Sequence, residues 1–117
     1  MKTSIVLTIA AVATQLSVSA ALAETEVRVP SDPSARYFVL ELTSVGEEAF
    51  EIITRREGSS GTSYALRRVT CNPYLFGYMA EGDTLANLDD RDPDPMMSVL
   101  VAGSISDVIS TYACQNG

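Results

Sequence analysis

The sequence contains no histidine and no tryptophan, and its single lysine is at position 2. Without histidine the chain cannot form a Ser-His-Asp triad, a Cys-His pair or a histidine-based zinc site. Catalysis would have to use carboxylates, arginine, serine or tyrosine. A hydrolytic carboxylate pair also needs a cleft and one carboxyl group with a raised pKa, and no motif singles out such a pair. We therefore expect a protein that is not an enzyme and holds no cofactor.

The first 23 residues have the layout of a secretory signal peptide. A short basic start that includes Lys2 precedes an apolar run at residues 5–12, and small residues at 21–23 (Ala-Leu-Ala) form a cleavage site. The apolar run is too short to cross a bilayer as a helix. No cysteine lies near the cleavage site to carry a lipid. We expect residues 24–117 to be released into the periplasm or secreted, with no membrane span in the mature chain.

Cysteine is scarce as well, and Cys71 and Cys114 are the two that exist. Two cysteines in a short exported chain are expected to pair. A bond that closes so long a loop stabilises a small domain by roughly 4 kcal/mol in the loop-entropy description. Because there is no C-x-x-C motif to supply a resolving thiol, we expect a structural disulfide and not a redox site.

The mature chain is strongly acidic. Loss of residues 1–23 removes the one lysine, so seven arginines remain against 15 acidic residues, and the net charge changes from −7 to about −8. Such a surface repels phosphate backbones and anionic membranes. We therefore expect no nucleic-acid partner. The charge would favour a cationic partner.

Apolar and β-branched residues predict four strands joined by short turns. The strands are expected at residues 36–43, 49–57, 62–71 and 74–80, and a fifth strand or buried extended segment at residues 96–102. Consecutive strands with such short connections pair as an antiparallel meander. Residues 24–35, which are polar and contain two prolines, are expected to form a flexible or extended lead-in.

The C-terminal segment has the pattern of an amphipathic helix. Ser104 and Asp107 form a start similar to a capping box. Apolar residues then recur on one face, at Ile105, Val108, Ile109, Tyr112 and Ala113. A helix of about ten residues is marginal alone, so it must dock on the sheet. The predicted fold is therefore α+β: residues 36–117 form an antiparallel sheet of four to five strands with one C-terminal helix and one disulfide.

Four arginines lie in pairs on either side of an expected glycine-serine turn. They are Arg55, Arg56, Arg67 and Arg68. If the hairpin pairs Glu57 with Thr62, Arg68 lies opposite Glu51. One interpretation is cross-strand ion pairing on a solvent-exposed face. The other is a grip on a carboxylated or sulfated glycan, because arginine binds such groups through two hydrogen bonds.

The expected strand at residues 74–80 carries three aromatic residues at alternate positions. Tyr74, Phe76 and Tyr78 therefore share one face. They could line the core under the helix, or they could form a contact patch for a carbohydrate or a protein.

Residues 81–95 are polar and acidic. Carboxylates at Asp90, Asp92 and Asp94 have the alternate spacing of a calcium loop, in which several oxygens converge on a hard cation. The EF-hand pattern then stops, because Pro95 and Val101 stand where glycine and glutamate are needed. We expect no metal site, and a solvated loop whose charges and prolines prevent edge pairing.

An arginine-rich strand ending in Cys71 is followed by an aromatic strand, a polar stretch and a small-residue helix start at residues 102–104, before Cys114. This order resembles the surface-adhesin protein E family of small exported bacterial domains. Ala102 stands where that family commonly has proline. The resemblance covers roughly residues 47–114. It implies an envelope or surface location and adhesin-like binding of a protein or glycan, not catalysis.

Residues 60–64 read Ser-Gly-Thr-Ser-Tyr. They resemble the S-G-x-x-Y loop with which periplasmic inhibitors of c-type lysozyme enter the enzyme's cleft, although the tryptophan-containing strand of that family is absent. The resemblance implies an alternative function, inhibition of a cationic hydrolase, with Ser60, Gly61 and Tyr64 as the contact residues. The acidic charge of the chain would steer it toward such an enzyme.

Overall fold

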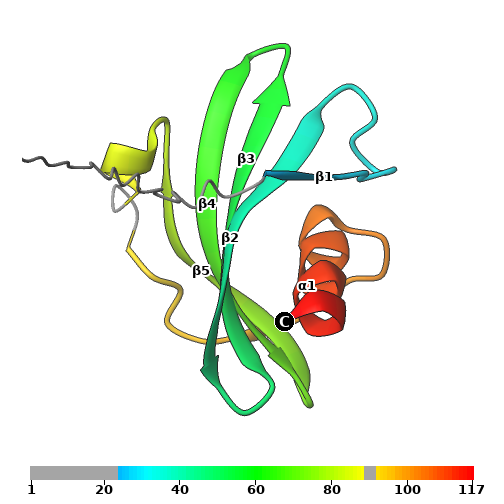
Figure 1. Cartoon of the computed structure of the whole chain (residues 1–117), viewed down its shortest axis with the longest axis vertical. Helices are drawn as coiled ribbons and strands as arrows, with labels where there is room; N and C mark the ends of the chain where they lie inside the picture. The colour runs from blue at the N-terminus through cyan, green and yellow to red at the C-terminus, as the bar shows by residue number, and fades with distance from the viewer. Residues whose placement is uncertain (1–23, 89–91) are drawn as a thin grey trace, which may run out of the picture.

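The computed structural model describes residues 24–88 and 92–117, so the expected signal peptide and residues 89–91 of the acidic loop lie outside the described part. Within these ranges the chain forms one six-stranded antiparallel sheet in sequence order and one α-helix (Figure 1). The strands are β1 Thr25–Val27, β2 Arg36–Gly46, β3 Ala49–Gly58, β4 Gly61–Cys71, β5 Tyr74–Gly82 and β6 Ser98–Val99; a 3₁₀ turn, η1, covers Leu85–Asn87, and the helix α1 covers Ile105–Asn116. The predicted α+β meander with one C-terminal helix and one disulfide is confirmed.

The sheet begins earlier than expected. Residues 24–35, expected as a flexible or extended lead-in, start with strand β1, which pairs with β2 and places Val27 opposite Tyr37. Val29, just after β1, is buried, and so is Tyr37. The sequence did not predict this strand, because a three-residue strand shows too little alternation to be recognised beside two prolines. The expected segment at residues 96–102 contributes only the two-residue strand β6.

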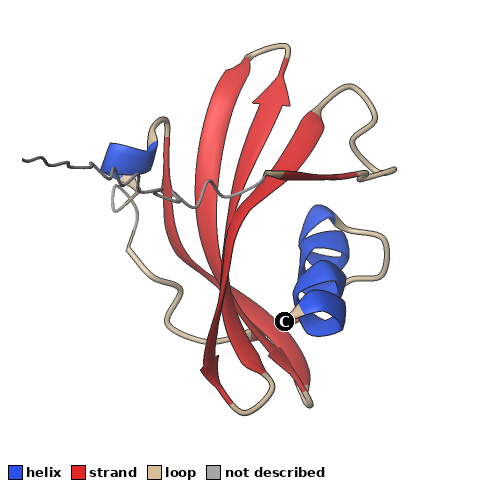
Figure 2. Cartoon of the chain, viewed as in Figure 1, coloured by secondary structure: helices blue, strands red, loops and turns tan. Residues whose placement is uncertain are grey.

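The helix packs on one face of the twisted sheet, and the β3–β4 hairpin extends past it (Figures 1 and 2). Residues buried between the two layers come from β2, β3, β4 and α1. They are Val39, Phe50, Ile52, Val69, Ile109 and Ala113. Register shifts interrupt the β2–β3 and β4–β5 ladders, the second between Leu66 and Arg67. Such irregularities bend strands and increase their twist, which lets the sheet curve around the helix.

The helix start is capped as predicted, but its buried face is rotated. Ser104 Oγ accepts a hydrogen bond from the Asp107 N–H (3.1 Å), and the Asp107 carboxylate accepts one from the Gly103 N–H (2.9 Å). The buried helix residues are Ser106, Ile109, Ser110 and Ala113. Two of these are serines, which a hydropathy pattern does not predict to be buried. Their small side chains let the helix approach the sheet closely.

The aromatic residues of β5 face the helix, which agrees with the first interpretation of that strand. The Tyr74 hydroxyl donates to Asp107 Oδ1 (2.8 Å), and Phe76 packs against the core cluster. Phe76 and Tyr78 meet edge to face, with ring centroids 5.6 Å apart. At the other end of the helix, the Cys71–Cys114 disulfide joins the end of β4 to the last turn of α1.

Replacing both cysteines with alanine is expected to lower the free energy of unfolding by roughly 2–4 kcal/mol, because the disulfide closes a loop between positions 43 residues apart. Urea denaturation followed by circular dichroism measures the change. Dithiothreitol should lower the stability of the wild type and leave the Cys71→Ala/Cys114→Ala variant unaffected. An unchanged urea midpoint in the variant would show that the helix docks without the covalent link.

Candidate functional site

The strand register divides the four candidate arginines between the two faces of the sheet. Arg68 lies opposite Glu51, as predicted, and Arg67 lies opposite the core residue Ile52. Because neighbouring strand residues point to opposite faces, Arg56 and Arg67 share the face that carries α1. Arg55 and Arg68 lie on the opposite face, which we call the outer face.

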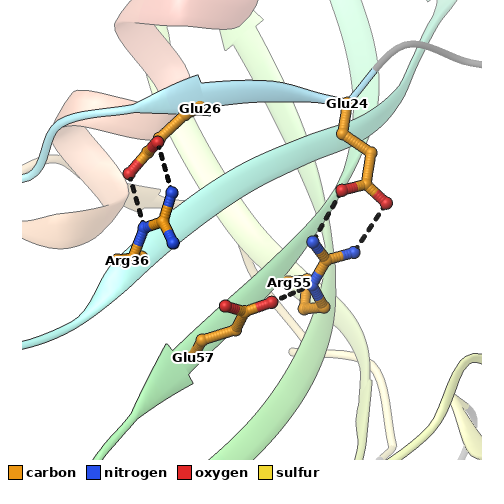
Figure 3. A network of polar contacts seen from close by, with 5 residues as sticks. All are labelled: Glu24, Glu26, Arg36, Arg55 and Glu57. Carbon is orange, nitrogen blue, oxygen red and sulfur yellow. Dashed lines mark hydrogen bonds and ion pairs between the residues drawn. The ribbon is translucent and has the colours of Figure 1, made fainter.

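On the outer face the arginines are engaged in ion pairs. Arg55 binds both carboxylate oxygens of Glu24 (2.6 and 2.8 Å) and also contacts Glu57 (2.8 Å), while Arg36 binds Glu26 (Figure 3). Hydrogen bonds from Arg55 and Arg36 lower the pKa of Glu24 and of Glu26, respectively. The two guanidinium groups also stack over the ring of Phe38. Arg68 pairs with Glu51. These contacts link neighbouring strands from β1 to β4, so these charged residues stabilise the sheet.

On the helix face, Arg56 belongs to a small network with Asp32 and Tyr37. Arg56 Nε donates to Asp32 Oδ2 (2.9 Å) and to the Tyr37 hydroxyl oxygen (3.0 Å), and the Tyr37 hydroxyl donates to Asp32 Oδ2 (2.7 Å). The hydrogen bond from Arg56 lowers the pKa of Asp32. Burial and the bond to Asp32 raise the pKa of Tyr37 to about 12.

Arg67 is the unusual residue of this face, because it is only 4% exposed. Nε donates to Ser106 Oγ (3.1 Å), Nη1 to Thr54 Oγ1 (3.0 Å) and Nη2 to the Tyr78 hydroxyl (3.0 Å). The guanidinium also lies over the Tyr78 ring, 4.7 Å from its centroid. None of the ion pairs between described residues includes Arg67. Its positive charge is therefore held in the interior by neutral hydroxyl groups.

A cavity of about 140 Å³ lies beside Arg67. Its lining includes Arg56, Arg67, Tyr37, Tyr78, Ser63 and Glu81. Ile105, the first residue of α1, also borders it, so the cavity lies at the N-terminal end of the helix. The lining combines guanidinium, hydroxyl and aromatic groups, which suit recognition of a polar ligand. A wider cleft at the β1–β2 connection contains none of the candidate binding residues.

The remaining candidate residues lie at or near the hairpin tip. Ser60 and Gly61 are exposed in the turn between β3 and β4, where Gly61 has a φ of 127°, a conformation that favours glycine. Tyr64 lies opposite Arg55, is half-buried and borders the cavity. The structure thus separates the predicted set into the hairpin tip, the outer face and the cavity. Thr54 and Ser106, which hold Arg67, were not predicted as site residues, and Tyr78 was considered only as part of an aromatic contact patch.

The acidic loop contributes to the sheet edge. Asp94 Oδ2 accepts from the Tyr78 N–H (2.9 Å), and the Asp94 N–H donates to the Tyr78 carbonyl (2.8 Å). One of the three carboxylates of the calcium hypothesis, Asp90, lies outside the described part. Residues 24–88 and 92–117 contain no group of three side chains suited to hold a metal ion. No helix within these ranges is long and apolar enough to cross a membrane.

Comparison with protein-family models, with curated proteins and with solved structures finds no match for this chain. Its function has to be inferred from its own residues.

The raised pKa of Tyr37 gives a testable pH dependence. A tyrosine whose pKa is higher in the folded state stabilises the fold below its unfolded pKa, and this contribution is lost as the pH rises through the folded value. We therefore expect stability to fall between about pH 10, the ordinary value for tyrosine, and pH 12. Urea denaturation across this range measures the loss. The Tyr37→Phe variant should lack this part of the pH dependence, and an identical profile in both proteins would contradict the account.

Proposed function

We propose that this protein is an exported, non-enzymatic envelope protein of bacterial type, an adhesin-like binding module that recognises a protein or glycan through the cavity beside Arg67. The observation that supports this most directly is the buried Arg67 at the wall of that cavity, held only by hydroxyl groups among the described residues. Guanidinium and hydroxyl groups recognise polar ligands through directed hydrogen bonds.

Three features support the exported, non-catalytic part of the proposal. The N-terminal segment has the layout of a signal peptide, and a disulfide such as Cys71–Cys114 persists in oxidising compartments. The absence of histidine removes the commonest general base and the commonest zinc ligand.

The test uses the exported, oxidised protein, immobilised and probed with an array of acidic and neutral glycans and with purified envelope proteins. We expect saturable binding of one class, weakened at least about tenfold in Ala65→Leu, whose larger side chain fills the cavity that Ala65 lines. Ala86→Leu makes the same change at an exposed position in η1 and serves as the control. Absence of saturable binding, or chemical turnover of a bound ligand, would contradict the proposal.

The hairpin tip supports a second candidate function, inhibition of a cationic hydrolase such as lysozyme. Ser60 and Gly61 are exposed at the tip, where they could enter a cleft. This function predicts that the protein slows cell-wall lysis by c-type lysozyme, and that Tyr64→Ala removes the effect while circular dichroism shows an unchanged fold. Lysis at the same rate with and without the wild-type protein would eliminate this candidate.

A further inference from the structure

We infer that the cavity beside Arg67 is a subsite for the carboxylate group of an acidic sugar. The inference rests on the proposed function, because it names the ligand class of the same site. Three observations carry it: the unused donors of Arg67, the charges around the cavity, and the chemistry of the remaining lining.

Arg67 has more N–H donors than its three hydrogen bonds use. A guanidinium carries five N–H groups, one on Nε and two on each terminal nitrogen. The three hydrogen bonds to Ser106, Thr54 and Tyr78 use one donor on each nitrogen. One N–H therefore remains on each terminal nitrogen, a pair that the two oxygens of a carboxylate can accept together. Such a ligand would also place a negative charge against Arg67, which forms no ion pair with the described residues.

The other charged groups around the cavity limit the ligand to one negative group. Arg56 is already neutralised by its contact with Asp32 (2.9 Å). Glu81 also lines the cavity, so the lining carries no excess of positive charge that would attract a polyanion. The cavity lies at the N-terminal end of α1, where the positive end of the helix dipole adds a weak attraction for the same carboxylate. The arrangement therefore favours a monocarboxylate over a polysulfated chain.

The rest of the lining is chemically complementary to the surface of a sugar. Ser63 and the hydroxyl groups of Tyr37 and Tyr78, which are hydrogen-bonded to Asp32 and Arg67, respectively, are the polar groups of this lining, while Ala65 and Ile105 provide apolar contacts. A sugar acid presents hydroxyls and C–H faces as well as its carboxylate, so it can use all of these groups. The space of about 140 Å³ is far larger than one water molecule needs.

The test titrates the exported, oxidised protein with sodium glucuronate, with glucose and with acetate, followed by NMR of the arginine Nε–H signals. Glucose differs from glucuronate in having a CH₂OH group in place of the carboxylate. We expect saturable glucuronate binding that shifts the Arg67 Nε–H signal, and glucose affinity lower by about tenfold or more, as expected for loss of a charged hydrogen-bonded pair. Arg67→Met should weaken glucuronate binding by a similar factor.

Arg68→Met, on the outer face, is the matched control and should bind glucuronate as the wild type does. If Arg67→Met does not fold, Ala65→Leu replaces it and should abolish the shift of the Arg67 signal. Equal affinity for glucose and glucuronate, or no saturable binding of glucuronate, would overturn the inference. Acetate binding as tight as glucuronate binding would overturn the assignment to a sugar. Glycan or protein binding that does not respond to Arg67→Met would overturn this inference and leave the proposed function standing.

Discussion

The position of the helix on the sheet depends on the buried positive charge of Arg67. Its three hydrogen bonds reach Thr54 on β3, Tyr78 on β5 and Ser106 on α1, so one side chain joins two strands and the helix. Burying a cation without a carboxylate is costly, and each partner has to be in place to offset that cost. The constraint therefore fixes where the helix begins relative to the sheet. It also explains why small polar side chains occur on faces that would otherwise be apolar.

The helix is held at both ends by different means. Near its start, Arg67 contacts Ser106 and Tyr74 contacts Asp107, whereas Cys114 in its last turn is bonded to Cys71 on β4. A helix of this length has little stability of its own, so these links and the packing of Ile109 and Ala113 determine its position. Because Ile105, the first residue of the helix, lines the cavity together with Ser63 and Ala65 of β4, the cavity lies between the first turn of α1 and the β3–β4 hairpin.

Much of the fold was predictable from local pattern. Alternating residues and short turns specify the meander, Ser104 specifies the helix start, and the two cysteines specify their bond. The candidate site was predictable only in part. The sequence singles out four arginines, but whether one of them is buried depends on strand register and on which helix face docks. Position 67 lies between Ala65 and Val69 on one strand face. An arginine at such a core position was the one feature of the sequence that could have indicated a buried charge. The hydroxyl partners are distant in the chain and carry no motif of their own, so only the folded structure brings them together.

The most direct test of this account is a crystal structure of the oxidised protein soaked with glucuronate, at a resolution that shows ordered water. The account predicts Arg67 hydrogen-bonded to Thr54, Tyr78 and Ser106, with a glucuronate carboxylate on its terminal nitrogens inside the cavity. A structure in which Arg67 pairs with a carboxylate of the protein itself, with water alone in the cavity, would contradict it.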